Sequence, residues 1–302
     1  MTETAASSLA LTLRENLRTF RIASWLGWQI ESNWADPIVF LIFSILRPMA
    51  AALIIVVMYQ VIAGGVRDDF FEYLFLSNAF FVLVTQALAG MSWTIFDDRE
   101  NYKMLKYVYT SPARKFAYLI GRAVGKIGIG ILTTLLLLAV GILFLHVRMD
   151  VRTIEWGWLS VYFVLGVIIL VSLGMVLAGV SLVIARHGEF IGEVTAGSLL
   201  LVSSAYFPPD ILPIGLKQLS LAVPVTYWLE AMRRSLMGGV LTTTFNGARV
   251  PLSPYLAIFS NVDLLLILTI SAVVCSIGSY YFFSWVEQRA KEKGMIDRVT
   301  GY

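Results

Sequence analysis

The stretch from Gly121 to Ile127 comes nearer to a nucleotide-binding motif than any other part of this sequence. A phosphate-binding loop reads Gly-x-x-x-x-Gly-Lys-Ser/Thr, with backbone N–H groups around the phosphates and a hydroxyl on the magnesium ion. Here Gly121 and Gly125 are one residue too close, and Ile127 replaces the hydroxyl residue. We therefore expect no ATP site on this chain. We interpret Gly121, Gly125 and Gly128 as small residues that let helices approach closely.

Hydrolytic and metal-dependent chemistry also lack the residues that they require. The sequence contains neither Gly-x-Ser-x-Gly nor His-Glu-x-x-His, and its one cysteine, Cys275, and two histidines, His146 and His187, are scattered. Such scattered ligands do not form a zinc site. The two histidines fall at opposite predicted membrane faces, which argues against an intramembrane Ser/His pair. The sequence predicts a protein that is not an enzyme and that holds no cofactor or metal of its own.

Four ionisable residues, Arg47, Glu189, Glu193 and Asp263, fall in or beside apolar segments. A charge inside a bilayer is costly, so such residues are candidates for function. Each also has a plain interpretation as an interface residue, with Arg47 reaching toward the polar surface, and we favour that interpretation. No chain of carboxylates crosses the apolar segments, which argues against a carrier coupled to protons or sodium ions.

The composition identifies the solvent in which these residues work. Of the 302 residues, 58% are hydrophobic and only 14% are charged, and the mean hydropathy is +0.77. Soluble domains carry about 25% charged residues, so this chain suits a bilayer rather than water. The net charge of +3 gives no reason to expect a nucleic acid partner.

The elements that must position these residues are apolar helices long enough to cross a bilayer. A spanning helix needs about 20 apolar residues, and the runs here are continuous rather than alternating as in a membrane barrel. We therefore predict an all-α polytopic membrane protein, in which residues 1–302 form a single transmembrane domain with six transmembrane helices. The six segments are Ile38–Ala63, Tyr73–Phe96, Ile127–Val147, Trp156–Ala185, Phe190–Phe207 and Leu264–Val286.

Lysine and arginine residues between these segments indicate the orientation. If both termini lie on one side of the membrane, the connections on that side carry more lysine and arginine residues than the connections on the other side. This excess predicts that both termini are cytoplasmic. The N-terminal stretch has no apolar core followed by a cleavage site, so we expect it to be retained. Residues 11–34 are predicted to form an amphipathic interfacial helix, with a plain cytoplasmic extension as the alternative. Its apolar stripe is Leu13, Leu17, Phe20, Trp25 and Trp28, flanked by Arg14, Arg18 and Arg21.

Two connections are irregular. Asp97–Ala117 has apolar residues at helical spacing before Thr110-Ser111-Pro112, which predicts a short cytoplasmic helix, a stop and a new helix. An ordinary loop fits that connection equally well. Pro208–Asn261 is broken by prolines around an apolar run that is too short to span. There we predict re-entrant helices in 208–234 on the outer side, and a surface loop with an interfacial helix is the alternative.

The order of residues in these two connections carries a resemblance. Residues 98–112 read Asp-Arg-Glu-Asn-Tyr-Lys-Met-Leu-Lys-Tyr-Val-Tyr-Thr-Ser-Pro, and Gly121–Lys126 follows as a small-residue entry into the third segment. The outer connection contains Phe207-Pro208, Leu212-Pro213, Leu219, Pro224, Thr226-Tyr227 and Leu229–Arg233. Together these features resemble the permease subunit of type-2 ABC transporters, in the exporter group. Tyr102-Lys103 stands where that family often has Gly-Thr, and Val225 replaces a leucine.

The resemblance implies how such a chain would work. It implies a homodimer, or a pair with a close relative, bound to ABC ATPase subunits that hold ATP and magnesium, in the cytoplasmic (inner) membrane of a prokaryote. Residues 98–112 would be the coupling helix, and segments 1, 2 and 5 of both copies would line the pathway. The residues implied at the ATPase are Glu100, Tyr102, Lys103, Met104, Leu105, Lys106, Val108 and Tyr109, with Met104, Leu105 and Val108 as apolar contacts; those implied at the outer gate are Phe207, Pro208, Pro224 and Tyr227.

The apolar and aromatic pathway residues favour export of a hydrophobic, lipid-like or drug-like substrate, with membrane lipid as a further partner. A polysaccharide or lipid-linked glycan exporter of the same family is one alternative. A secondary transporter or a membrane scaffold, each working without an ATPase, is the other.

Overall fold

The computed structural model describes residues 2–33, 69–111, 114–184, 187–188, 190–245 and 248–296, with isolated positions between 36 and 61. The predicted first span, Ile38–Ala63 with Arg47, lies mostly outside these residues, as do Trp34, Pro112 and Glu189. The elements in chain order are α1 (Thr2–Ser32), α3 (Asp69–Phe96), the π-helix η1 (Asp97–Asn101), α4 (Leu105–Thr110), α5 (Lys115–Leu143), α6 (Trp156–Val183), α7 (Phe190–Val202), the 3-10 helix η2 (Pro209–Ile211), α8 (Ile214–Ala222), α9 (Pro224–Met237), β1 (Thr242–Phe245), β2 (Ala248–Pro251), α10 (Pro254–Ala257) and α11 (Asn261–Glu292).

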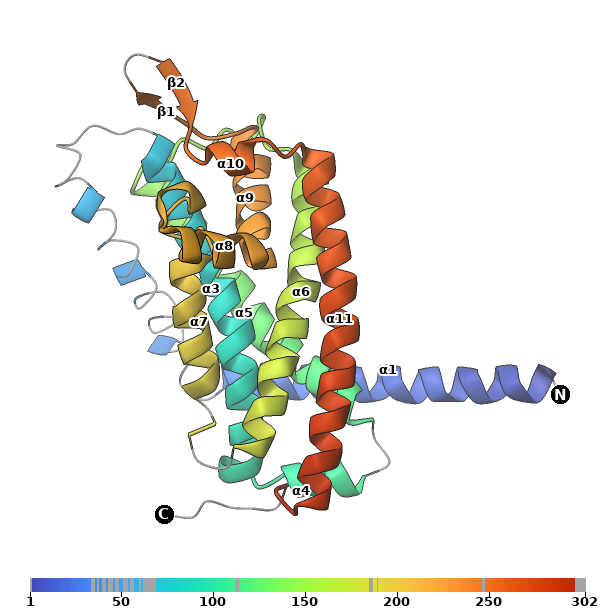
Figure 1. The fold of residues 1–302 in the computed structure, drawn as a ribbon. Coiled ribbons are helices and arrows are strands. Elements are labelled where there is room, and N and C mark those ends of the chain that lie inside the picture. Colours follow the sequence, from blue (N-terminus) through green and yellow to red (C-terminus); the bar gives the residue numbers. More distant parts are fainter. Residues whose placement is uncertain are drawn as a thin grey trace.

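Long apolar helices form the bundle (Figure 1). Within the described residues, four helices are long and apolar enough to cross a membrane: Asp69–Asn101, Lys115–Leu143, Trp156–Val183 and Asn261–Glu292. They coincide with the predicted second, third, fourth and sixth segments and confirm an all-α polytopic membrane protein. The third helix begins twelve residues earlier than predicted, because its charged residues Arg122 and Lys126 are paired inside the bundle with Asp98 and Glu31.

Helix α3 occupies the centre of the bundle, against α5, α6, α7 and α9. The apolar window of Asp69–Asn101 is 83% buried, and none of its side chains from Asp69 to Glu100 is fully exposed. This corrects the expectation that segment 2 lines a pathway, because neighbouring helices surround it. Helix α11, packed mainly on α6, instead keeps most of its apolar surface exposed, as a helix facing lipid does.

Helix α1 lies across the bundle, close to the end that carries α4 (Figure 1). Its main contact is α5, where glycines bring the two backbones together. A Cβ on Gly121 would lie 2.6 Å from the Cβ of Ala23, and one on Gly125 would lie 2.6 Å from the carbonyl carbon of Gly27. The interpretation of Gly121 and Gly125 as sites of close helix approach is therefore confirmed. Lys126 of α5 also pairs with Glu31 of α1.

The predicted fifth span is shorter than expected. We expected Phe190–Phe207, but α7 ends at Val202 after 13 residues, which is about 20 Å of helix and too short for a bilayer core of about 30 Å. The chain bends at Ser203 and Ser204, where Ser204 has a φ of +63°, a left-handed conformation that ends a helix.

The connection from α7 to α11 contains the predicted pair of short helices, α8 and α9, which meet at Val223 and Pro224. It also contains a feature that we did not predict, an antiparallel hairpin in which Thr243 pairs with Val250. Asp263, which we interpreted as an interface residue, closes a capping box with Ser260 at the start of α11.

Adding a methyl group at the α1–α5 crossing should loosen it. We expect Gly125→Ala to lower the free energy of unfolding by about 1–3 kcal/mol, because the new Cβ meets backbone atoms that cannot turn away. Gly278→Ala in α11 is the matched control, since nothing lies within 4 Å of its Cβ. Unfolding of both variants in detergent measures the difference, and equal stability would contradict the close packing.

Candidate functional site

A buried ion pair fixes the end of the bundle near α4. The carboxylate of Asp98, in η1, is completely buried and accepts hydrogen bonds from Arg122 Nη2 at 2.9 Å and Tyr118 Oη at 2.8 Å. Both donors lie on α5. Because an unpaired charge in this apolar setting would cost several kcal/mol, the pair holds the end of α3 and α5 in one relative position.

The neighbouring Arg99 joins the same end of the bundle to α6. Its guanidinium is buried and points at the last carbonyl oxygens of α6, those of Ser181, Leu182 and Ile184, at 3.4–3.5 Å. Carbonyl oxygens at a helix C-terminus carry partial negative charge, so a cation is favourable there. Arg99 Nε also pairs with Glu100 at 3.2 Å. The ends of three helices are thus held by two adjacent residues of η1.

A tight backbone turn then presents α4. The N–H of Met104 donates to the carbonyl oxygen of Asp98 at 2.8 Å, and Lys103 adopts a φ of +52° to make the turn. That left-handed conformation favours glycine over lysine, so Lys103 is held in it by the surrounding contacts.

The predicted ATPase-contact residues separate into three groups by exposure. Tyr102, Lys103 and Lys106 are exposed, whereas Glu100, Met104, Val108 and Tyr109 are half-buried. Leu105 is only 2% exposed and packs in the core, which corrects the expectation that it presents an apolar contact. Beside Tyr102, a second exposed ring on this surface belongs to Tyr107, which was not predicted from the sequence and which is 66% exposed. We name Tyr102, Lys103, Lys106 and Tyr107 the α4 surface.

Tyr109 faces inward, toward the end of α11. Its ring lies 5.5 Å from the ammonium of Lys291, and burial, with nearby Glu287, raises the pKa of its phenol well above the ordinary value. Tyr109 therefore links α4 to α11 rather than belonging to the α4 surface.

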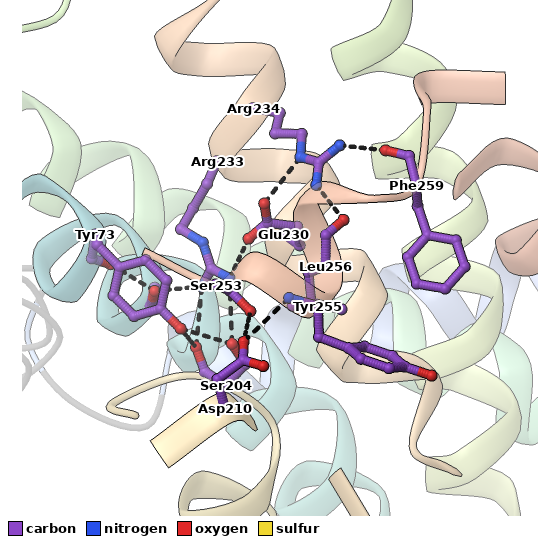
Figure 2. A network of polar contacts seen from close by, with 11 residues as sticks. Tyr73, Ser204, Asp210, Glu230, Arg233, Arg234, Ser253, Tyr255, Leu256 and Phe259 are labelled. Atoms are coloured by element: carbon purple, nitrogen blue, oxygen red, sulfur yellow. Dashed lines mark hydrogen bonds and ion pairs between the residues drawn. The ribbon is translucent and has the colours of Figure 1, made fainter. Parts of the chain in front are cut away.

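A second ionic cluster holds α9 (Figure 2). Glu230 accepts from Arg233 Nη2 at 2.7 Å and from Arg234 Nε at 2.8 Å, and all three side chains are buried. The spacing of three and four residues places them on one helix face. Burial alone would raise the pKa of Glu230, but the two guanidinium groups outweigh it and hold that pKa below its ordinary value.

Arg233 ties this cluster to α3 and to the bend after α7. It donates to Ser77 Oγ at 2.6 Å and to the carbonyl oxygen of Ser204 at 3.0 Å, and its guanidinium lies 4.1 Å from the centre of the Tyr73 ring. Tyr73 Oη itself donates to the Ser204 carbonyl at 2.8 Å. The bend that ends α7 is therefore held by polar groups of α3 and α9 (Figure 2).

Arg234 extends the cluster in the other direction, to the segment before α11. Its guanidinium donates to the carbonyl oxygens of Phe259 at 2.6 Å and Leu256 at 2.5 Å. Trp228, six residues earlier on α9, donates to the Tyr162 carbonyl at 3.0 Å and packs against Gly166 of α6. Helix α9 thus packs between α3 and α6, and hydrogen bonds of Arg233, Arg234 and Trp228 hold it in place.

The four predicted gate residues do not form one cluster. Phe207 is exposed and contacts Tyr206, Pro208 is buried, and Pro224 begins α9. Tyr227 packs on Phe259 and donates to the Leu221 carbonyl at 2.9 Å. Across the described ranges, no ring contact or hydrogen bond joins Phe207 to Tyr227.

Neither ionic cluster was predicted from the sequence. Glu230 with arginines three and four residues later is a local signal that could have revealed the α9 cluster, but Asp98 and Arg122 are 24 residues apart and have no such signal. Among the residues that the structure describes, no group of three His, Cys, Asp or Glu side chains is placed to hold a metal ion.

Comparison with known proteins adds an independent finding. A family model described as "ABC-2 type transporter" matches residues 18–237, which is more than half of the chain and includes the C-terminal part of α1, both ionic clusters and the α4 surface. A comparison with curated proteins gave no match.

Removing the central carboxylate of the α9 cluster should destabilise the chain strongly. We expect Glu230→Gln to lower the free energy of unfolding by about 3–5 kcal/mol, because two buried guanidinium groups lose their counter-charge. Lys217→Gln is the matched control, since its pair with Asp210 at 3.2 Å is partly exposed and should contribute less than about 1 kcal/mol. Both are measured by unfolding in detergent; similar losses for the two variants would show that burial does not strengthen the cluster.

Proposed function

This chain belongs to the ABC-2 type transporter family, and we propose that it is the permease of an ATP-driven exporter whose ATP is hydrolysed on a separate ATPase subunit. Membership makes the chain a multi-pass membrane component of an ABC transporter rather than an enzyme. The ATPase partner, a second copy of this chain, outward transport and a location in the cytoplasmic membrane of a prokaryote belong to the proposal.

The observation that carries the proposal is the α4 surface. It presents Lys103, Lys106 and two tyrosines beyond the end of the bundle, and it stands directly on the buried Asp98–Arg122 pair and on Arg99. Basic residues around exposed aromatic rings suit an acidic, partly apolar groove on a protein partner. A displacement of α4 would pass to α3, α5 and α6 together, because η1 holds all three.

A pathway along α7 fits the exposed side chains of that helix. Glu193, Gly197 and Ser198 are exposed on α7, and Glu193 is held by Trp93 Nε1 at 3.2 Å. Polar groups directed into lipid are costly, so we assign this face to the pathway, opposite a second copy of the chain. Val194 and Leu201 are exposed on the same helix, which suits a hydrophobic, lipid-like or drug-like substrate.

Helix α9 would act as a fixed wall near the outer end of this pathway. Its ionic cluster holds the bend at Ser204, and that bend ends α7. The length of the pathway face of α7 therefore depends on α9. Among the predicted gate residues, exposed Phe207 follows that bend and is the one placed to meet a substrate.

Charge reversal on the α4 surface tests the ATPase contact. We expect Lys103→Glu with Lys106→Glu, or Tyr107→Ala, to lower co-purification with the ATPase subunit and its stimulated ATP hydrolysis in nanodiscs by about tenfold or more, as loss of a charged or aromatic anchor does. Arg152→Glu, an exposed arginine in the connection between α5 and α6, is the control and should leave both unchanged. Full association of the charge-reversed chain would place the ATPase elsewhere.

A bulky side chain on α7 tests the pathway. The Cβ positions of Gly197 in α7 and Gly278 in α11 both face open space, with nothing within 4 Å. We expect the Gly197→Trp chain to lose most of its export activity in vesicles while it still associates with the ATPase. The Gly278→Trp chain, whose new side chain would face lipid, should export normally. Equal export by the two variants would remove α7 from the pathway.

A further inference from the structure

An open groove lies where α1 crosses α5. Its volume is about 780 Å³, and its walls include Arg18, Arg21, Trp25 and Trp28 of α1 together with Val124 and Gly125 of α5. The close backbone approach at Gly125 forms its floor. We name it the α1 groove, and we propose that it binds one acidic phospholipid of the surrounding leaflet.

The order of residues along α1 supports an amphiphilic ligand. Arg18, Arg21, Trp25 and Trp28 follow one another at spacings of three or four residues, so they share one face of the helix. The cationic half of that face precedes the aromatic half. A ligand that fills the groove therefore needs an anionic group at one end and an apolar part beside it.

The two arginines are available for such a ligand. Both are exposed, and within the described part of the chain neither guanidinium has an ion pair or a hydrogen bond. Arginine binds phosphate oxygens through paired N–H donors, which makes the headgroup phosphate the fitting anion. Lys126 and Glu31, which lie nearby, already pair with each other and do not compete for it.

The position of the groove favours a lipid over a soluble anion. Helix α1 crosses the membrane-spanning helices instead of running with them, and Trp25 and Trp28 remain 65% and 38% exposed (Figure 1). Tryptophan rings on such a helix lie at the level of the lipid headgroups, where arginine side chains reach the phosphates. The volume accommodates a headgroup and the first part of its acyl chains, and the remaining chain extends into the bilayer.

A protein partner fits the groove less well. The α4 surface, which carries the proposed ATPase contact, lies farther along the bundle than α1 (Figure 1). The groove is lined on the α5 side by Val124, an exposed apolar side chain that suits an acyl chain better than a charged protein surface. The lipid site therefore does not depend on the proposed ATPase contact, and either can fail without the other.

Quenching of tryptophan fluorescence by brominated lipids tests the site. The full chain is placed in nanodiscs of phosphatidylcholine that contain a minor fraction of either brominated phosphatidylglycerol or brominated phosphatidylcholine. We expect phosphatidylglycerol to quench at roughly 25-fold lower mole fraction, because the two arginines contribute about a factor of five each in affinity. Trp25→Phe with Trp28→Phe should remove that difference. Equal quenching by the two lipids would overturn the proposal.

Variants separate this site from general attraction to anionic lipid. Each basic residue near an anionic surface contributes about a factor of five in affinity, so Arg18→Gln with Arg21→Gln should weaken phosphatidylglycerol quenching roughly 25-fold. Arg14→Gln, also exposed on α1 but outside the groove, should change it less than about fivefold. Unchanged lipid quenching in the double variant, together with lost ATPase co-purification, would assign the groove to the protein partner instead.

Discussion

The neutralisation of charge inside an apolar bundle is the constraint on which the rest of this structure depends. Asp98 and Glu230 are buried carboxylates, and each is buried only because arginines from its surroundings reach it. An uncompensated charge in such an environment costs several kcal/mol, comparable to the whole stability of many proteins. The Asp98–Arg122 pair therefore requires α3 and α5 in one relative rotation and at one height, which apolar packing alone specifies less sharply. Glu230 is neutralised within α9, and its arginines Arg233 and Arg234 then fix α9 through hydrogen bonds to neighbouring segments.

Helix α3 connects the two ionic clusters. It contributes Tyr73 and Ser77 to the cluster around Arg233, and its continuation η1 contributes Asp98 and Arg99 at the opposite end. The 33 residues of this span correspond to about 50 Å of helix. Because α3 is enclosed along its length, it is placed to act as a stiff link between the surface where we propose the ATPase binds and the bend that ends α7.

Close backbone packing complements the ionic contacts. Lipid chains are as apolar as leucine, so helices in a bilayer associate through tight fit and polar contacts rather than through exclusion of water. The α1–α5 crossing uses this principle, and it lies next to the Asp98–Arg122 pair, since a Cβ on Gly27 would be 3.1 Å from the Arg122 carbonyl oxygen. Helix α1, the proposed lipid site and the base of α4 consequently all contact one helix, α5.

The sequence by itself determined the fold class, four of the long apolar helices, the N-terminal helix and the two irregular connections, because these follow from local runs of apolar, basic and proline residues. It also indicated the family through residues 98–112 and the outer proline motifs. Only the tertiary structure decided that Leu105 is internal while Tyr107 is exposed, that α7 stops at Val202, and that Asp98 belongs with Arg122. The physical reason is that burial and charge pairing arise between segments distant in sequence, and helical periodicity alone does not reveal which face of a helix meets a neighbour.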